Sequence, residues 1–545
     1  MSRKLLLFAA MLSAAVCTDR SWGQSDRFDT GKYLEIQSAM LRAINDQYVD
    51  TVRLDDLLET GINAMLASLD PYTVFIPEED EENLDMLTTG SYGGVGAIIQ
   101  KLPTGEILIS EPYEGSAAVK CGLQPGDRII AIDGKSTDSL SVSQSSEMMR
   151  GRPGTVLNMD IVKVRTGDTV SIDLVRERIH INDVVYYGML DDSTGYIRIG
   201  GFTLDGHKDV GNALDTLRKN GRMKRLVMDL RYNGGGLLKE AVDILSFFLP
   251  EGTEVVSAKG KHRNSSFSHR TAGAPVDTVM PMLVMVNSSS ASSSEIIAGA
   301  LQDLDRAVIA GNRTYGKGLV QSIRPLAYNT SLKLTTAKYY TPSGRCVQAI
   351  DYTHRNADGS AGAVPDSLKK TFHTSKGRPV YDGGGITPDI DIEAQYYSRP
   401  IISLIYSGIL SDFAIEYYSG HESVPSPSEL TLTDEDYEDF IKFASGKEFD
   451  SRTESEIEME NVLKAFRREG LGDDIEGADE AIEALKDRLS LSKEEFLRAN
   501  RDIIRHLLED EIAIKYYFQR GGTESALRWD TQLQEAVEKW DTVKL

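Results

Sequence analysis

Cysteine and long apolar segments are what this sequence has least of. It contains three cysteines in 545 residues, and Cys17 lies close to the N-terminus. Cys121 and Cys346 are far apart in the sequence and could pair, but nothing resembles a disulfide framework. No apolar run reaches the roughly 18 residues that a membrane-spanning helix requires. The large domains must therefore be held together by packing.

Basic side chains are also in deficit. The chain has 60 Lys and Arg against 83 Asp and Glu, which gives a formal net charge of −23. An acidic surface repels phosphate backbones, so non-specific nucleic-acid binding is excluded. No CxxC or HExxH motif occurs, and the sequence therefore predicts no metal site and no other cofactor. With 41% hydrophobic residues the chain is not a disordered one.

Residues 1–24 have the pattern of a secretory signal. A basic start, Met1-Ser2-Arg3-Lys4, precedes an apolar run from Leu5 to Val16. A buried N-terminal helix is the alternative. Cys17 is a candidate for lipid attachment, although Val16 is larger than the residue that a bacterial lipobox normally has there. Cleavage after Cys17 and cleavage near Gln24 both stay open.

The rest of the chain divides by its hydrophobic periodicity. Residues 25–91 look helical, and residues 92–178 contain short β-like runs separated by turns. Residues 179–395 alternate strands with helices, which predicts a mixed α/β core. Within it, residues 351–385 are polar and glycine-rich and are interpreted as a surface insertion. The sequence thus predicts a multidomain α/β protein.

Residues 396–545 form a separate acidic helical domain in this interpretation. The segment 429–545 carries 31 acidic and 17 basic side chains, an excess of 14 negative charges. Apolar residues recur at helical spacing over 478–489 and 496–508, which indicates amphipathic helices. Such a domain is most often a solvated surface, but a dimer interface, an adaptor-docking site and an inhibitory cover are open alternatives.

A serine cluster is the most unusual local feature. Asn287-Ser288-Ser289-Ser290-Ala291-Ser292-Ser293-Ser294-Glu295 lies between a predicted buried strand, 282–286, and a predicted helix from 296. Flexible linkers do not occupy such a junction. A sharp strand-to-helix turn exposes a hydroxyl and directs backbone N–H groups at one point, where they can stabilise an oxyanion. The serines could instead serve only as helix N-caps.

A glycine-flanked lysine is the candidate base for such a serine, because none of the eight histidines lies within 270–353. Glycines on both sides of Lys317 leave room for neighbouring backbone. A desolvated lysine has a lowered pKa, and its neutral amine can accept a proton from serine. A phosphate-binding loop is the alternative, but GxxxxGK[ST] is absent. Gly234-Gly235-Gly236 is a second candidate oxyanion element, or a phosphate loop, or a tight turn.

Taken in order, these motifs resemble the carboxyl-terminal processing (tail-specific) peptidases, which are serine–lysine proteases with an inserted PDZ domain. The resemblance runs from about Tyr33 to Asp391. It rests on an ordered set of motifs: Leu69-Asp70-Pro71-Tyr72, Tyr92-Gly93-Gly94-Val95-Gly96, Leu123-Gln124-Pro125-Gly126-Asp127, Asp229-Leu230-Arg231 with its glycines, Ser290 to Glu295, Tyr315-Gly316-Lys317-Gly318 and Lys333 to Arg345.

The resemblance implies a role for each matching residue. Ser292 would be the nucleophile, Lys317 the general base and Gln321 the residue that orients the lysine amine. The backbone N–H groups of Ser293 and of Gly235 or Gly236 would form the oxyanion hole. The chain departs from the family pattern by having serine at Ser288 and Ser289, where glycine is common, and at Ser293, where alanine is common.

The β-rich module resembles a PDZ domain, which binds a peptide as an added strand. Gly94-Val95-Gly96-Ala97 matches the loop that receives a peptide's C-terminal carboxylate. Val95 and Ile98 would line the pocket for the last side chain. Arg150 could sense the carboxylate or couple the domains, or be an ordinary solvated loop arginine.

The resemblance thus implies an exported serine endopeptidase, in the bacterial periplasm, that binds unstructured C-terminal tails of protein substrates. No cofactor is implied. A non-catalytic peptide-binding scaffold or adaptor and a serine enzyme acting on non-peptide acyl bonds are the competing interpretations.

Overall fold

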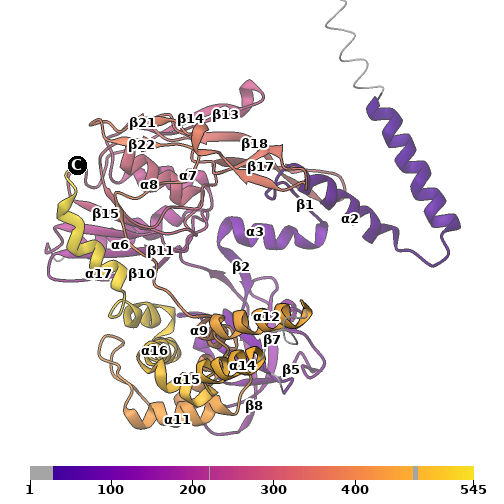
Figure 1. Ribbon diagram of the computed structural model, residues 1–545, viewed down its shortest axis with the longest axis vertical. Coiled ribbons are helices and arrows are strands. Elements are labelled where there is room, and N and C mark those ends of the chain that lie inside the picture. Colours follow the sequence, from indigo (N-terminus) through magenta and orange to yellow (C-terminus); the bar gives the residue numbers. More distant parts are fainter. Residues whose placement is uncertain (1–28, 103, 220, 470–476) are drawn as a thin grey trace, which may run out of the picture. The chain divides into compact units, whose positions relative to one another are not determined.

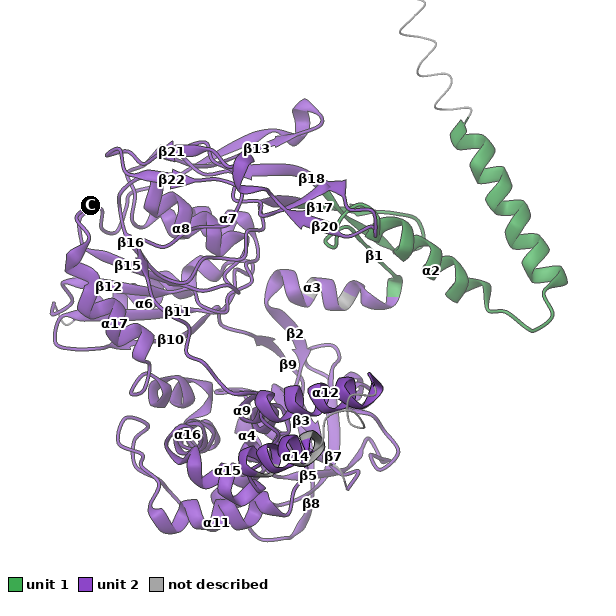
Figure 2. Cartoon of the chain, viewed as in Figure 1, with its two compact units in different colours: residues 1–78, 321–335 green, residues 79–320, 336–545 purple. Residues whose placement is uncertain are grey.

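The computed structural model describes residues 29–545 except 103, 220 and 470–476. The predicted signal segment, 1–24, lies outside the described residues. The chain divides into two compact units, residues 1–78 with 321–335 and residues 79–320 with 336–545 (Figure 2). Among the described residues, no helix combines the length and the apolar character needed to cross a membrane.

The first unit combines helices with a small antiparallel ladder. A helix over residues 29–47 is followed by α2 (Leu54–Ala67). The side chain of Asp70 accepts hydrogen bonds from the N–H groups of Tyr72 and Thr73 and turns the chain. The strand β1 (Val74–Ile76) then pairs with residues 331–333 of β18 (Ser331–Tyr340), which also pairs with β17 (Leu319–Pro325). Residues 74–76 are thus extended, a strand that the helical pattern of 25–91 did not indicate.

A five-stranded antiparallel sheet, with the short β6 (Lys135–Ser136) on β5, occupies much of the predicted PDZ segment in the second unit. Its order is β3-β4-β5-β7-β8, so β3 lies at an edge. The helices α4 (Ala117–Lys120) and α5 (Val142–Met149) complete it. The strands are β3 (Ala97–Lys101), β4 (Ile107–Pro112), β5 (Arg128–Ile132), β7 (Val156–Val162) and β8 (Thr169–Val175). Alternate residues of β7, Leu157, Met159 and Ile161, are buried in one apolar cluster, as the period of two in a strand requires.

The chain enters and leaves this module through a strand pair. β2 (Ser91–Gly94) runs antiparallel to β9 (Glu177–His180), and α3 (Glu81–Thr89) precedes β2. The module is therefore an insertion whose two ends are tied together.

A six-stranded sheet forms the centre of the second unit (Figure 1). Its order is β10-β11-β12-β15-β16-β23, and every neighbouring pair except β10–β11 is parallel. The strands are β10 (Val184–Met189), β11 (Thr194–Ile199), β12 (Arg225–Asp229), β15 (Met282–Val286), β16 (Val308–Gly311) and β23 (Ile390–Asp391). Because the carboxyl ends of β12 and β15 meet at one edge of this sheet, the glycine loop and the serine cluster become neighbours.

Both faces of this sheet are buried, and helices from distant parts of the sequence cover them. On one face, Met228 and Val284 join a core with α6 (Gly206–Arg218), α7 (Leu238–Ser246) and α8 (Ser293–Asp303). On the other face, Val227 and Leu283 pack with Leu533, Ala536 and Trp540 of α17 (Thr531–Lys539) and the turn after it. The last helix therefore supplies part of the core of the central sheet.

The remaining strands form smaller ladders. Residues 337–340 of β18 pair with β13 (Glu254–Gly260), which pairs with β14 (Phe267–Arg270). The predicted surface insertion, 351–385, forms two hairpins, β19–β20 (Ile350–Arg355, Ala361–Ala363) and β21–β22 (Thr371–His373, Pro379–Tyr381). Cys121 and Cys346 do not form a disulfide.

The acidic C-terminal segment folds as a helical domain around its own apolar core, which includes Phe413, Phe440 and Phe496. The helices are α9 (Arg399–Tyr406), α10 (Ile409–Gly420), α11 (Asp434–Ser445), α12 (Glu454–Arg468), α14 (Ala478–Leu489), α15 (Lys493–Ala499) and α16 (Arg501–Ala526). The two helices predicted over 478–489 and 496–508 are present, but α15 ends before Asn500 and α16 starts after it.

The helix α16 is broken in its middle. Tyr517 and Phe518 have non-helical backbone angles, and the φ of Phe518 is 59°. A bulky residue at positive φ is an outlier that surrounding contacts must hold in place. On either side of the break, the ammonium of Lys515 donates to Ser110 O and the amide of Gln519 to Glu111 Oε2, both on β4. The break therefore lies where the helical domain contacts the five-stranded module.

Candidate active site

The serine cluster is an ordered loop at the start of α8. Ser292 is the last residue before the helix and is partly exposed, whereas Ser290, Ser293 and Ser294 are buried. Ser288 and Ser289, where the family commonly has glycine, are exposed. The hydroxyl of one serine is thus accessible at a helix N-terminus, where the helix dipole favours negative charge.

The backbone of Ser292 is strained. Its φ is 54° and its ψ −112°, a combination that L-residues with a side chain rarely adopt. Strain of this kind costs of the order of 1–3 kcal/mol and persists only where surrounding contacts impose it. The Ser292 carbonyl accepts hydrogen bonds from Ile296 N and from the hydroxyl of Tyr339. These contacts hold the turn that exposes the Ser292 side chain.

A buried carboxylate ties the serine turn to the lysine loop. Glu295 Oε2 accepts hydrogen bonds from Ser292 N at 2.9 Å and from Lys317 N at 2.8 Å. Its Oε1 accepts from Thr314 Oγ1 at 2.6 Å and from Gly316 N at 2.8 Å. Burial raises the pKa of Glu295, and these four donors oppose that rise. A single carboxylate oxygen therefore bridges the backbones of Ser292 and Lys317.

The glycines beside Lys317 permit close backbone packing. A Cβ at Gly316, whose φ is +86°, would lie 2.4 Å from Ala349 Cβ, and one at Gly318 would lie 2.7 Å from Gln348 N. Gly318 N donates to the side chain of Gln348 at 2.8 Å, and Gly318 O accepts from Tyr339 N. These contacts fix the lysine loop from both sides.

Gln321 belongs to the first compact unit, whereas Ser292 and Lys317 belong to the second. Its side-chain amide donates to Thr335 Oγ1 at 3.2 Å within that unit. The role of Gln321 beside the lysine amine stays a prediction from its position in the sequence.

The glycine loop after β12 lies against the serine turn. A Cβ at Gly235, whose φ is +98°, would lie 2.7 Å from Ser292 Cβ and 3.0 Å from Ser293 N. The Gly235 N–H donates to Asn233 Oδ1 at 2.9 Å. Two of the three predicted oxyanion donors, Ser293 N and Gly236 N, have no acceptor among the described residues.

Buried serine hydroxyls join the two loops. Ser290 Oγ donates to Leu230 O at 2.8 Å, Ser294 Oγ to Asn233 O at 2.9 Å and Ser293 Oγ to Gly236 O at 2.9 Å. Ala291 N also donates to Asn233 O. The serine that replaces the family's alanine at 293 thus fixes the carbonyl of Gly236 through its side chain, a role that the sequence did not suggest.

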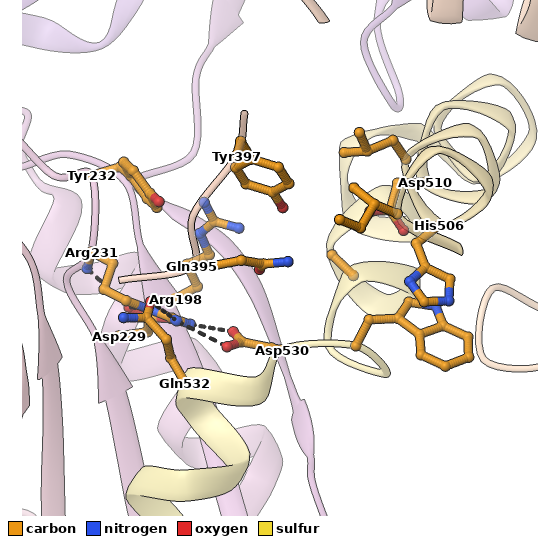
Figure 3. Close-up of a pocket in the computed structure, with 14 residues that line it drawn as sticks. Arg198, Asp229, Arg231, Tyr232, Gln395, Tyr397, His506, Asp510, Asp530 and Gln532 are labelled. Atoms are coloured by element: carbon orange, nitrogen blue, oxygen red, sulfur yellow. Dashed lines mark hydrogen bonds and ion pairs between the residues drawn. The ribbon is translucent and has the colours of Figure 1, made fainter. Parts of the chain in front are cut away.

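An ion pair anchors the start of the glycine loop. The guanidinium of Arg231 contacts Asp229 with NH2–Oδ2 at 2.6 Å, and both side chains are nearly inaccessible to solvent. Burial works to raise the pKa of Asp229, but the charge and hydrogen bonds of Arg231 hold it below its ordinary value. Arg231 also pairs with Asp530, which lies just before α17 (Figure 3).

The predicted peptide-binding loop of the five-stranded module borders a cavity. The cavity has a volume of about 220 Å³, and its walls come from the loop, the edge strand β3, the helix α5 and α3. Val95, Gly96 and Ala97 line it, as do Met86, Tyr92, Ile98, Ile99, Tyr113, Ser146, Met149, Arg150 and Ile181. Gly94 lies beside it, next to the ring of Tyr92. Arg150 donates to Asn83 of α3 at 3.2 Å, so its side chain does link the module to that helix.

A second cavity of about 190 Å³ separates the central sheet from α16 (Figure 3). Arg198, Arg231 and Gln395 line one side, and His506 and Asp510 of α16 line the other. Asp510 Oδ1 is buried and has no hydrogen-bond partner among the described residues. Burial raises the pKa of Asp510 to about 7; the Ser525 side chain and Arg528 act against this rise, whereas Glu509 and Glu511 add to it.

This pKa predicts a pH-dependent stability. The folded state keeps the Asp510 proton at pH values above the ordinary pKa of 3.8. The contribution of this group to the free energy of unfolding is therefore complete below about pH 4, falls as the pH rises toward 7 and then levels off. The total is at most about 4 kcal/mol. We expect Asp510→Asn to lose less of its apparent Tm than the wild type between pH 5 and 8. Equal pH dependence of Tm in the two proteins would contradict the prediction.

One group of possible metal ligands occurs among the described residues. Ligand atoms of His207, Glu240 and Asp243 lie within 4.8 Å of one another. Glu240 accepts from His207 Nδ1 at 2.7 Å and from the backbone N–H groups of Asp205 and His207, and Asp243 pairs with Lys239. Both carboxylates lie on α7 and are thus engaged by His207 of α6, by backbone N–H groups and by Lys239.

Family comparisons define the class of this protein. The sequence model of Peptidase family S41 matches residues 193–355, and that of a PDZ domain matches 108–163. A model described as the C-terminal helical domain of a probable PDZ-protease matches 401–539. The protein is a serine-type peptidase with a PDZ domain and a C-terminal helical domain, which confirms the predicted class and fold.

The chain is also similar to named relatives. A carboxy-terminal-processing protease of Bartonella bacilliformis is 34% identical over 359 residues, 65% of this chain and 82% of the relative. A carboxyl-terminal-processing protease of Synechocystis is 36% identical over 343 residues, 62% of this chain and 75% of the relative. The solved photosystem II D1 C-terminal processing protease shares 25% identity with a TM-score of 0.34, covering 65% of this chain and 86% of that chain. The chain belongs to the carboxyl-terminal processing protease family.

Proposed function

We propose that this protease cleaves its substrates with Ser292 as the nucleophile and Lys317 as the general base. The observation that carries the proposal is the double acceptor role of Glu295 Oε2, which bonds Ser292 N and Lys317 N. It fixes the two loops against each other. The strained, partly exposed Ser292 at the start of α8 supports the same assignment.

The reaction proceeds through an acyl-enzyme. The neutral amine of Lys317 accepts the Ser292 hydroxyl proton as Oγ attacks the scissile carbonyl carbon. The resulting oxyanion is bound by backbone N–H groups, and the lysine returns the proton to the leaving amine as the peptide bond breaks. Water, deprotonated in turn by Lys317, then hydrolyses the ester and restores Ser292. Gln321 orients the lysine amine in this scheme.

Ser293 N and Gly236 N are the best-supported oxyanion donors. Both lack an acceptor among the described residues, whereas Gly235 N is bonded to Asn233. Gly235 has a different part in the proposal, since only glycine allows its backbone to approach Ser292 this closely.

The PDZ domain selects the substrate by its C-terminal tail. The edge position of β3 leaves one side of that strand able to pair with a peptide, and the adjoining cavity is lined by Val95, Ala97 and Ile98. In this proposal the loop Gly94–Ala97 receives the terminal carboxylate. The insertion of the domain between α3 and the central sheet supports a further role in gating cleavage.

The catalytic assignment is tested with unfolded casein. Ser292→Ala is expected to abolish cleavage, whereas Ser289→Ala, at an exposed position of the same loop, is expected to keep wild-type activity. Cleavage by Ser292→Ala at the wild-type rate would refute the nucleophile.

Tail recognition is tested by placing a charge in the cavity. Ile98→Asp is expected to weaken binding of a fluorescent apolar C-terminal peptide at least about tenfold, because the new carboxylate repels the terminal one and disfavours an apolar side chain. Ile130→Asp is the matched control, since Ile98 and Ile130 are 40% and 39% exposed and Ile130 does not line the cavity. Fluorescence anisotropy measures both, and equal affinities would contradict the proposed site.

Export to the periplasm is the cellular part of the proposal, and it rests on the signal pattern of residues 1–24. A mature protein that begins after Cys17 or near Gln24, recovered from the periplasmic fraction, is the expected result. N-terminal sequencing of the intact leader in the cytoplasm would exclude it. Adaptor binding or self-association through residues 396–545 is proposed on sequence grounds alone.

A further inference from the structure

We propose that Asp530 is a positioning residue for the oxyanion loop, residues 230–236, and acts on it through Arg231. The proposal rests on the proposed function, because it takes this loop to hold one oxyanion donor. It makes the N-terminal end of α17 a direct support of the catalytic site.

The contact itself is a three-residue ion cluster in which Arg231 and Asp229 are buried and Asp530 is half-buried. Arg231 is 9% exposed, and Asp229 is 1% exposed. Arg231 Nε donates to Asp229 Oδ2 at 3.0 Å, and NH1 donates to Asp530 Oδ1 at 3.0 Å. NH2 donates to the same Asp229 oxygen, Oδ2, and to the second oxygen of Asp530, Oδ2. Figure 3 shows Arg231 between the two carboxylates. All three guanidinium nitrogens therefore donate hydrogen bonds: Nε to Asp229 of the central sheet, NH1 to Asp530 before α17, and NH2 to both carboxylates.

The charges of the cluster favour this arrangement. The two carboxylates hold the pKa of Arg231 well above its ordinary value, although its burial acts in the opposite direction. A buried arginine with two ionised partners is locked in one geometry, because removing a partner leaves a buried charge incompletely compensated. Bidentate contacts add directional constraint.

The position of Arg231 in the chain transmits this constraint to the catalytic loop. Leu230 O and Asn233 O accept the hydroxyls of Ser290 and Ser294, and Tyr232 N donates to Asn287 Oδ1. Tyr232 itself has a φ of 63° and is 68% exposed, so its side chain contributes little packing to hold that conformation. The side chain of Arg231 adds to these bonds a contact that holds the strained stretch from the C-terminal part of the chain.

Asp530 is suited to act as a support because it is itself fixed. Its Oδ1 accepts from Leu533 N at 2.9 Å and caps α17, which packs on the far face of the central sheet. The carboxylate therefore reaches Arg231 from a helix that cannot shift without disturbing the core. Loss of its charge is expected to let the oxyanion loop move by fractions of an ångström, which lowers kcat while leaving ground-state binding intact.

Two substitutions separate this role from the cap. Asn and Ser both keep an oxygen that can cap α17. Asn removes the negative charge, and Ser removes the charge and is also too short to contact Arg231. For Asp530→Asn and Asp530→Ser we expect kcat on unfolded casein to fall about 10- to 100-fold with KM unchanged. The affinity for a peptidyl boronic acid, which mimics the tetrahedral intermediate, is expected to fall by the same factor. Asp530→Glu is expected to recover most of the activity.

A matched control comes from the same helix. Glu535 of α17 forms an exposed ion pair with Lys539, and Glu535→Gln is expected to keep kcat, KM and boronic-acid affinity. Wild-type kcat in Asp530→Asn would overturn the proposal. A kcat loss that is absent at 15 °C, in a variant whose Tm is lowered, would also overturn the proposal, because the loss would then report unfolding. Cleavage of casein by Ser292→Ala would instead refute the proposed nucleophile. That result is distinct from a wild-type kcat in Asp530→Asn, which would refute only the role of Asp530.

Discussion

Replacement of Lys317 by alanine is expected to lower kcat on unfolded casein by about 10⁴-fold, the loss typical of a disabled nucleophile–base pair. Without an amine, no group of this loop can accept the Ser292 proton as Oγ attacks. The backbone contacts of residue 317, which donates N–H to Glu295, do not depend on the side chain. The variant is therefore expected to fold with a Tm close to that of the wild type.

Chemical rescue makes this prediction specific. Methylamine added to Lys317→Ala is expected to restore part of the activity, because a small free amine can occupy the vacated position, whereas it restores nothing in Ser292→Ala. Lys224→Met, at an exposed lysine remote from the serine turn in sequence, serves as the control and is expected to keep wild-type kcat. A Lys317→Ala protein with kcat within tenfold of the wild type would rule out the lysine as base.

Substitution of Glu295 by glutamine is expected to lower kcat by about 10²- to 10³-fold. A carboxylate accepts at both oxygens, and here both accept two donors each. A carboxamide has one NH2 group, which would face two N–H or O–H donors in a fully buried site. Each buried donor left without an acceptor costs about 1–3 kcal/mol, so the serine and lysine loops are expected to move apart.

The matched control separates this effect from general destabilisation. Glu240 is also buried and also accepts two backbone N–H groups, from Asp205 and His207, but none of these bonds goes to the serine turn or the lysine loop. Glu240→Gln is expected to lower Tm to a similar degree and to leave kcat at the wild-type level at 20 °C. Equal kcat values for Glu295→Gln and Glu240→Gln would show that Glu295 has no special part in catalysis.

Much of the central sheet was predictable because its strands are fully buried. Runs such as Leu226-Val227-Met228 and Met282 to Val286 are apolar on both faces, and such continuous runs are typical of parallel strands covered by helices. The serine junction was predictable for the same reason, since it follows one of these strands. The strand β1 was missed because three residues give no periodicity, and its partner lies in a distant hairpin.

The support of the site was less predictable. Glu295 stands three residues after the N-terminal Ser292 of α8, and the capping-box pattern was a local signal for its bond to Ser292 N. Its bonds to Gly316 and Lys317 had no such signal. The contact of Arg231 with Asp530 joins residues 299 positions apart, and the break at Tyr517 and Phe518 contains neither glycine nor proline. These features arise from tertiary packing, which overrides local preference.

The place of α17 also means that the core of the central sheet can be completed only at the end of synthesis. Leu533, Ala536 and Trp540 fill one face of the central sheet, so Val227 and Leu283 stay open to solvent until this helix has left the ribosome. Ser292 and Lys317 are translated long before then. The growing chain therefore carries residues 292 and 317 before the sheet that positions them has a complete core.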